Sequence, residues 1–231
     1  MLVRLRVRLL KTSVHLPMGQ YEVSAAHVKH ILDTEPRLSH ELTATDLSTT
    51  DKMNFRAVVR LTSESTLRCI RKQDDATATE LYPTLMKDIS DAFINQDTPV
   101  LRRISLIWRV VFFLRAWRAW LVEEGYSVQD NFITMNAFVC LELNARGLLL
   151  SVRHLRDAGR PELFLPTLFC SQPCESGFRD VRSQTSFNWT AVNVSMRELL
   201  RRAGRIELQA IIASQLADEF IFPRYFRINL S

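Results

Sequence analysis

Helix-breaking residues are scarce in this chain, and this scarcity constrains its fold more than any other feature. The 231 residues contain only six glycines and eight prolines. The sequence has no internal repeat, no linker rich in glycine and serine, and no low-complexity run. Because glycine and proline are the residues that most often interrupt helices, long helices are the natural consequence. We therefore expect a mainly α fold with few strands.

Apolar residues at spacings of three and four predict where the helices lie. The predicted helices cover residues 23–32, 51–71, 76–94 with an interruption near Pro83, 100–123, 131–157, about 175–182, and 196–220. Residues 100–123 are apolar on nearly all sides, which is typical of a central, buried helix, and Gly125 ends it. Asn131 or Thr134 caps the next helix, and Pro223 terminates the last one.

The N-terminus has a different pattern. From Val3 to Leu9, apolar residues alternate with arginines, which is the period of a strand with one basic face. The same stretch is rich in arginine, and no acidic residue precedes Glu22. Both features are also typical of a mitochondrial transit peptide. We expect a strand or an unstructured arm here, and no convincing strand elsewhere.

Charge and cysteine content narrow the function classes. The net charge is +5 with a pI near 9.3, and arginine greatly outnumbers lysine, a balance that suits phosphate-bearing partners. The four cysteines lie in apolar surroundings and are expected to be free thiols. Without a signal peptide, a nuclear or cytoplasmic protein is expected rather than a secreted one. The apolar stretch 104–121 contains three arginines, so we expect no membrane span there.

Several sequence blocks carry a resemblance to a known family. They read DKMNFRA at 51–57, FFLRAWRAW at 112–120, NFITMNA at 131–137, ELNA at 142–145 and SQPCE at 171–175. In their order and spacing they resemble the P-element family of DNA transposases, including the THAP-domain transposase-like proteins. The match covers about residues 42–224, and residues 1–41 form an unmatched N-terminal arm.

The resemblance implies a ribonuclease-H-like catalytic domain that is interrupted by a helical insertion domain binding GTP. Residues 42–160 would be the GTP-binding insertion, and residues 161–231 the C-terminal helical part of the catalytic domain. Glu175 matches the late glutamate that, with two earlier aspartates, holds two Mg²⁺ ions for DNA strand cleavage and transfer. Read from the residues alone, Glu175 is a helix-start carboxylate favoured by the helix dipole.

The metal site that the resemblance implies is incomplete. Both aspartates should lie on strands before the insertion, but Asp33 and Asp46 are the only early candidates and neither lies in a strand-like run. A single carboxylate does not hold two divalent ions. The chain is therefore expected to be transposase-like but not a complete enzyme alone.

The resemblance also indicates nucleotide-binding residues. Lys52 aligns with a lysine that approaches phosphate, and Asp91 with Asn95 would bind the guanine base. The alternatives are an exposed lysine at a helix start for Lys52 and a helix-ending asparagine for Asn95.

DNA is the partner expected from the last helix, and a homo-oligomer is a further option. Its arginines share one face and could follow a DNA backbone, although a solvated basic face explains them equally well. These residues are Arg197, Arg201, Arg202 and Arg205. Trp117 and Trp120 are expected in the core rather than as platforms for bases.

The hypothesis is therefore a fragment or domesticated relative of a P-element-type transposase, with Mg²⁺ and GTP as implied cofactors. The rival is a non-catalytic helical module that binds DNA or another protein.

Overall fold

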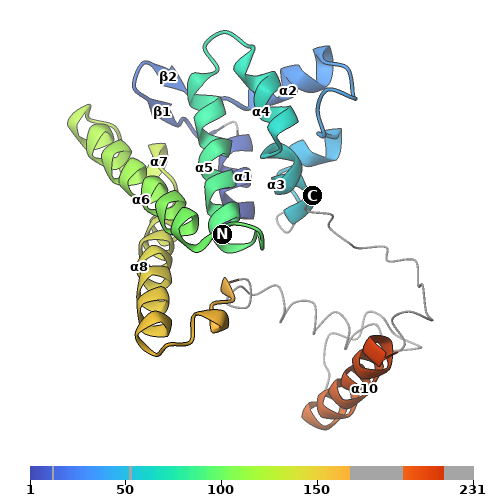
Figure 1. The fold of residues 1–231 in the computed structure, drawn as a ribbon. Helices are drawn as coiled ribbons and strands as arrows, with labels where there is room; N and C mark the ends of the chain where they lie inside the picture. The colour runs from blue at the N-terminus through green and yellow to red at the C-terminus, as the bar shows by residue number, and fades with distance from the viewer. Residues whose placement is uncertain (12, 52–53, 167–194, 216–231) are drawn as a thin grey trace. The chain divides into compact units, whose positions relative to one another are not determined.

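The computed structural model describes residues 1–11, 13–51, 54–166 and 195–215, and it divides the chain into two compact units, Met1–Thr167 and Leu168–Ser231. Nearly all regular structure in the described residues is helical, so the expectation of a mainly α fold is confirmed (Figure 1). Strands are limited there to a two-stranded antiparallel hairpin, β1 (Pro17–Met18) and β2 (Tyr21–Glu22), whose turn contains Gly19 with a φ of 63°.

The N-terminus forms a helix, α1 (Leu2–Leu10), so the prediction of a strand or an unstructured arm is wrong. Leu2, Leu5 and Leu9, at helical spacings of three and four, are buried against α3 and α5. Arg6 is also fully buried, and its guanidinium donates to the backbone carbonyls of Asp46 (2.7 Å) and Asp51 (2.5 Å). Tertiary contacts therefore select the helix from a sequence whose period also suits a strand.

Arg8 connects α1 to residues 129–132, which come much later in the sequence of the same unit. Its Nε donates to the Phe132 carbonyl oxygen at 3.0 Å, and its Nη2 donates to those of Gln129 and Asp130 at 3.0 and 2.7 Å. These carbonyls lie in and just after the short helix α7 (Val128–Asn131).

The region after the hairpin contains four short helices: α2 (Ala25–Thr34), the 3-10 helix η1 (Ala44–Leu47), α3 (Phe55–Leu61) and α4 (Glu64–Arg71). The single helix expected up to residue 71 is thus divided in two. Ser63 causes the division, because its side chain accepts from the Thr66 N–H and caps α4. The Thr62 hydroxyl meanwhile donates to the Val58 carbonyl at the end of α3.

Three long helices follow in this unit: α5 (Thr77–Phe93), α6 (Val100–Glu123) and α8 (Met135–Asp157), with a 3-10 turn η2 (Pro161–Leu163) after α8. The interruption expected at Pro83 is absent, and α5 continues through this buried residue. Gly125, with a φ of 75°, follows α6, and Thr134 caps α8. In Figure 1, α6 lies between α5 and α8.

Trp117 occupies the centre of this core, as expected. It is 4% exposed, its ring lies 4.8 Å from the Phe132 ring centroid and 6.5 Å from that of Tyr82, and its Nε1 donates to the Pro17 carbonyl at 2.7 Å. Trp120 is partly buried against the same core. Cys69 and Cys140 are free thiols, while Cys170 and Cys174 lie outside the described residues.

The prediction that α6 is buried on nearly all sides is only partly correct. One face carries eight buried residues, but Leu101, Phe112 and Val122 on the other side are exposed. Among the described helices, α8 alone has the length and hydropathy of a membrane span, and one such helix is weak evidence. Residues 104–121, where the sequence predicts no membrane span, are not such a candidate.

In the second unit, the structure describes one helix, α10 (Met196–Gln215). Leu200 and Ile211, expected to face inward, are exposed there. The helix expected at 175–182 and the terminator Pro223 lie outside the described residues.

Candidate functional site

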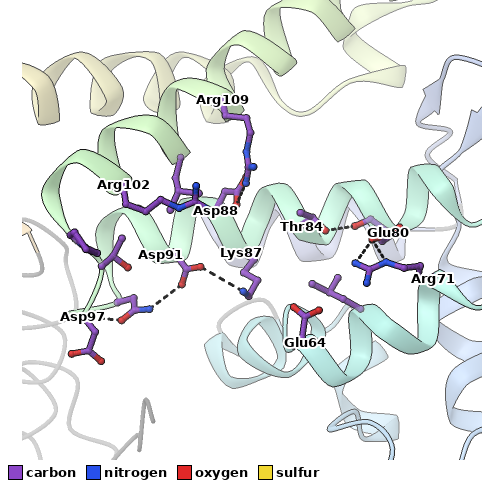
Figure 2. Close-up of a pocket in the computed structure, with 15 residues that line it drawn as sticks. Glu64, Arg71, Glu80, Thr84, Lys87, Asp88, Asp91, Asp97, Arg102 and Arg109 are labelled. Carbon is purple, nitrogen blue, oxygen red and sulfur yellow. Dashed lines mark hydrogen bonds and ion pairs between the residues drawn. The ribbon is translucent and has the colours of Figure 1, made fainter.

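A polar cavity of about 420 Å³ lies between α4, α5 and the first half of α6 (Figure 2). Its volume falls within the range typical of small-molecule sites. Most of its lining side chains are charged or polar and come from three helices and the loop between α5 and α6. They include Glu64, Arg71, Glu80, Thr84, Lys87, Asp88, Asp91, Asn95, Asp97, Arg102 and Arg109. A cavity of this composition suits a polar, charged ligand rather than an apolar one.

Two of the predicted nucleotide-binding residues, Asp91 and Asn95, lie together on the wall of this cavity. They are four residues apart at the end of α5, and Asn95 Nδ2 donates to Asp91 Oδ1 at 3.2 Å. Lys87, one turn earlier, has its Nζ 3.8 Å from Asp91 Oδ2. Asn95 also stabilises the turn after α5, since its Oδ1 accepts from the Asp97 N–H at 3.1 Å. Figure 2 shows this row of contacts along one edge of the cavity.

Arg103 fixes the loop that carries Asn95, and the sequence interpretation missed it. This arginine is 3% exposed, and its guanidinium donates to the carbonyls of Ala92 (2.9 Å), Asn95 and Gln96 (3.1 Å). These carbonyls lie at or just after the end of α5, where backbone carbonyls have no N–H partner within the helix. Burial lowers the pKa of Arg103, while the nearby Asp91 opposes that shift. Because its partners are backbone carbonyls, no motif in the sequence indicated this role.

Two ion pairs stiffen the remaining cavity wall. Arg109 Nε donates to Asp88 Oδ2 at 2.9 Å, and Arg71 Nε donates to Glu80 Oε1 at 2.8 Å. Burial raises the pKa of Asp88 above its ordinary value, although Arg109 acts in the opposite direction. By contrast, Arg102 is exposed and makes no ion pair with another described residue. Of the cavity's arginines, Arg102 is therefore the one best placed to meet an anionic ligand.

The other residues that the resemblance assigns to nucleotide and metal are not described. Lys52 and Glu175 lie outside the described residues. Within the described ranges, no three His, Cys, Asp or Glu side chains come together in a way that could hold a metal ion.

The predicted DNA-binding arginines lie on α10. Glu198 sits between them, with its Oε1 2.7 Å from Arg201 Nη2 and 2.8 Å from Arg202 Nε. These hydrogen bonds lower the pKa of Glu198 to about 2. Arg197 and Arg205 are exposed and form no ion pair within the part of the chain that the structure describes. The basic face is therefore partly neutralised, and Arg197 and Arg205 carry most of its available charge.

A second cavity of about 540 Å³ lies between α2 and α4 and was not predicted. It is lined in part by His27, His30, Cys69 and Lys72. The Nδ1 of His27 lies 2.8 Å from Thr79 Oγ1, which also accepts from the Ser24 N–H at 2.9 Å, so His27 is held by the fold.

Comparison with known proteins identifies no relative: no family model, no curated protein and no solved structure matches this chain.

Proposed function

We propose that Met1–Thr167 is a nucleotide-binding helical unit from a fragment or domesticated relative of a P-element-type DNA transposase, with GTP bound in the cavity between α4, α5 and α6. The observation that supports this proposal is the adjacency of Asp91 and Asn95 on the cavity wall. The sequence resemblance, the cavity volume and the exposed Arg102 are consistent with it.

The chemistry of guanine fits these two side chains. Guanine presents two adjacent donors, N1–H and the exocyclic N2–H, and a carboxylate can accept both. Asp91 uses one oxygen for Asn95 and has the other 3.8 Å from Lys87, and each carboxylate oxygen has two lone pairs. The second N–H of the Asn95 amide would donate to guanine O6. Adenine lacks N1–H and N2–H, so Asp91 would exclude it.

The phosphates would bind by charge. Arg102 would contact them from α6, and Lys87 would lie between base and phosphates on α5. Mg²⁺ would bind together with the phosphates of the nucleotide. The unit would thus bind GTP without carrying out the strand chemistry, which the resemblance assigns to Glu175 and missing aspartates.

The test exchanges the base specificity. Asp91→Asn replaces one acceptor oxygen by a donor, which opposes guanine N2–H but matches the O2 of xanthine. We expect GTP with Mg²⁺ to raise the melting temperature of the wild-type chain. At a hundredfold excess of GTP over its Kd, the free energy of unfolding should rise by about 2.7 kcal/mol. Asp91→Asn should weaken GTP at least tenfold and strengthen xanthosine triphosphate.

The control is Asp97→Asn, the same substitution at another carboxylate of the same cavity. It should leave both affinities within about twofold, since an exposed side chain outside the base site contributes little. No GTP-dependent shift of the wild-type chain at millimolar nucleotide, or unchanged specificity in Asp91→Asn, contradicts the proposal.

A second proposed activity is contact with a DNA backbone through α10. It is favoured by the exposure of Arg197 and Arg205 on one face of that helix. Cleavage of DNA would require Glu175 together with aspartates from another chain or segment. Mg²⁺-dependent cleavage that survives Glu175→Ala contradicts the catalytic part of the hypothesis.

A further inference from the structure

The cavity between α4, α5 and α6 has two distinct ends, because α5 and α6 run antiparallel. Arg103, early in α6, reaches the carbonyl of Ala92 near the end of α5. Arg109, later in α6, reaches Asp88, which lies one turn earlier in α5. Residues further along α6 therefore lie further from the loop that carries Asn95. Asn95 thus marks one end of the cavity, and Arg109 lies toward the other.

Two arginines of α6 line this cavity at positions two helical turns apart. Arg102 and Arg109 are separated by seven residues, so they lie on one face of the helix, about 10.5 Å apart along its axis. Leu106 lines the cavity between them and is 3% exposed, so the wall between the two arginines is apolar. A ligand bound between Asp91 and Arg102 meets Arg109 next as it extends along α6.

Asp88 holds Arg109 in one orientation. The Asp88 side chain is 7% exposed, and its carboxylate accepts from Arg109 Nε at 2.9 Å and from Nη2 at 2.5 Å. Figure 2 shows Arg109 extending from α6 to this carboxylate on α5. The Arg109 side chain is 53% exposed, and its Nη1 makes no hydrogen bond with another described residue. Since a guanidinium carries five N–H donors in a planar fork, the edge away from Asp88 keeps donors for a ligand.

The acidic residues that line this end of the cavity are compensated by arginines. Asp88 accepts from Arg109, and Glu80 accepts from Arg71 at 2.8 Å. Glu64 lies within electrostatic range of Arg71 as well. Each of these three carboxylates therefore has a cationic neighbour, which reduces their repulsion of an anionic ligand at Arg109.

We propose that Arg109, positioned by Asp88, binds the terminal phosphate of the nucleotide and makes the cavity select a triphosphate over a diphosphate. This role rests on the proposed function, in which Asp91 and Asn95 bind the base and Arg102 contacts the phosphates. A nucleotide bound in that direction runs from the loop end along α6, so its last phosphate lies nearest Arg109. A hydrogen bond between a guanidinium and a phosphate is charge-assisted and strong enough to decide such a preference.

The test compares GTP with GDP, each with Mg²⁺, by calorimetric titration of the full chain. Replacing Arg109 alone by a neutral residue would leave Asp88 buried without its partner, which destabilises the fold. The double variant Asp88→Asn/Arg109→Gln instead replaces the ion pair by a neutral pair that can still form a hydrogen bond. We expect the wild-type chain to bind GTP about tenfold more tightly than GDP, and the double variant to bind the two equally, with its GDP affinity unchanged.

The matched control is Arg115→Gln/Glu142→Gln, which neutralises another ion pair of α6, formed with α8 outside the cavity. It should keep the wild-type preference for GTP. Arg109→Lys keeps the charge but not the planar fork, so it should weaken GTP about fivefold and leave GDP unchanged. Circular dichroism should be unaltered in all these variants.

Inorganic tripolyphosphate separates the role of Arg109 from that of Asp91, because it has no base. It should bind the wild-type chain and Asp91→Asn equally, and the Asp88→Asn/Arg109→Gln variant about tenfold more weakly. This result without any preference for guanine would contradict the base assignment and leave the role of Arg109 intact. A preference for GTP over GDP that persists in the double variant overturns the proposal for Arg109, as does binding of neither GTP nor tripolyphosphate.

Discussion

Asp46 offers the sharpest test of how this fold is held together. Its side chain is 2% exposed and receives two hydrogen bonds from Arg60, one of them from Nε at 2.7 Å. It also accepts from the Thr43 N–H at 2.8 Å, which closes a capping box at η1. The Asp46 backbone carbonyl in turn receives the buried Arg6. One carboxylate thus connects α3 with η1 beside the contact that anchors α1.

Asp46→Ala removes all the side-chain contacts at once. Breaking a buried ion pair costs about 3–5 kcal/mol, and losing a helix cap costs about 1 kcal/mol. Arg60 is 28% exposed, so water replaces part of what it loses. We therefore expect a loss of about 3 kcal/mol, or a decrease of about 6–12 °C in melting temperature for a unit of this size.

Urea unfolding followed by circular dichroism measures this loss, with Asp33→Ala as the control. Asp33 is exposed on α2 and makes no ion pair with another described residue, so its replacement should change stability by less than about 0.5 kcal/mol. Asp46→Asn keeps an acceptor for the Thr43 N–H, so its loss of stability should be about half that of Asp46→Ala. A difference below about 1 kcal/mol between Asp46→Ala and the wild type would refute the reasoning.

The same carboxylate predicts a dependence on pH. Burial raises the pKa of Asp46, but the hydrogen bonds from Arg60 and Thr43 outweigh burial, so its pKa in the folded state is below the ordinary value. Its stabilising contribution is therefore complete above the unfolded pKa, about 3.9, and is lost as the pH falls through the lower folded value. The stability difference between wild type and Asp46→Asn should shrink below about pH 4, and a constant difference down to acid unfolding contradicts the assignment.

Three further predictions concern α1, the core and α10. Leu5→Ala should destabilise the chain by about 2–4 kcal/mol in urea unfolding, whereas Leu38→Ala at a fully exposed leucine should have no measurable effect. Tyr82→Phe removes the hydroxyl that donates to the Leu5 carbonyl at 3.2 Å and should cost about 1 kcal/mol, and stability equal to wild type would show that this bond contributes nothing. If α10 binds DNA, Arg205→Gln should reduce the slope of log affinity against log salt by about 0.9, and Arg201→Gln, paired with Glu198, by less. Equal slopes for the two variants would exclude the phosphate contact at Arg205.

The sequence predicted the long helices well because their signals are local. Pro99 and Gly125 flank α6, and its observed bounds are those expected. Thr134 was one of two named caps for α8, and it is the cap observed. Such signals for the start and end of a helix depend on a few neighbouring residues and do not require knowledge of the fold.

The errors arose where contacts distant in sequence decide the structure. The nine residues of α1 satisfy both a period of two and helical spacing, and α3, α5 and the carbonyls that receive Arg6 select the helix. Pro83 should interrupt a helix, yet the burial of its neighbours Tyr82 and Met86 holds α5 together. The capping serine at 63 was a local signal, but the apolar pattern on both sides obscured it.

The candidate site was predictable only in part. The pairing of Asp91 and Asn95 follows from their spacing of four on one helix end, so the sequence could suggest it. The cavity itself could not be predicted, because it depends on how α4 and α6 approach α5. Arg103 was missed for the same reason, since its partners are backbone carbonyls that no residue type identifies.

The contacts of Arg8 have a consequence for the synthesis of this protein. Its guanidinium reaches the Phe132 carbonyl, 124 residues later in the chain. At a translation rate of about 5–20 residues per second, α1 leaves the ribosome roughly 6–25 seconds before that partner does. During this interval the apolar side of α1 has only part of its final surroundings. Leu2, Leu5 and Leu9 pack against α3 and α5, which are synthesised earlier than α7, so the contacts of α1 that form last are those of Arg8.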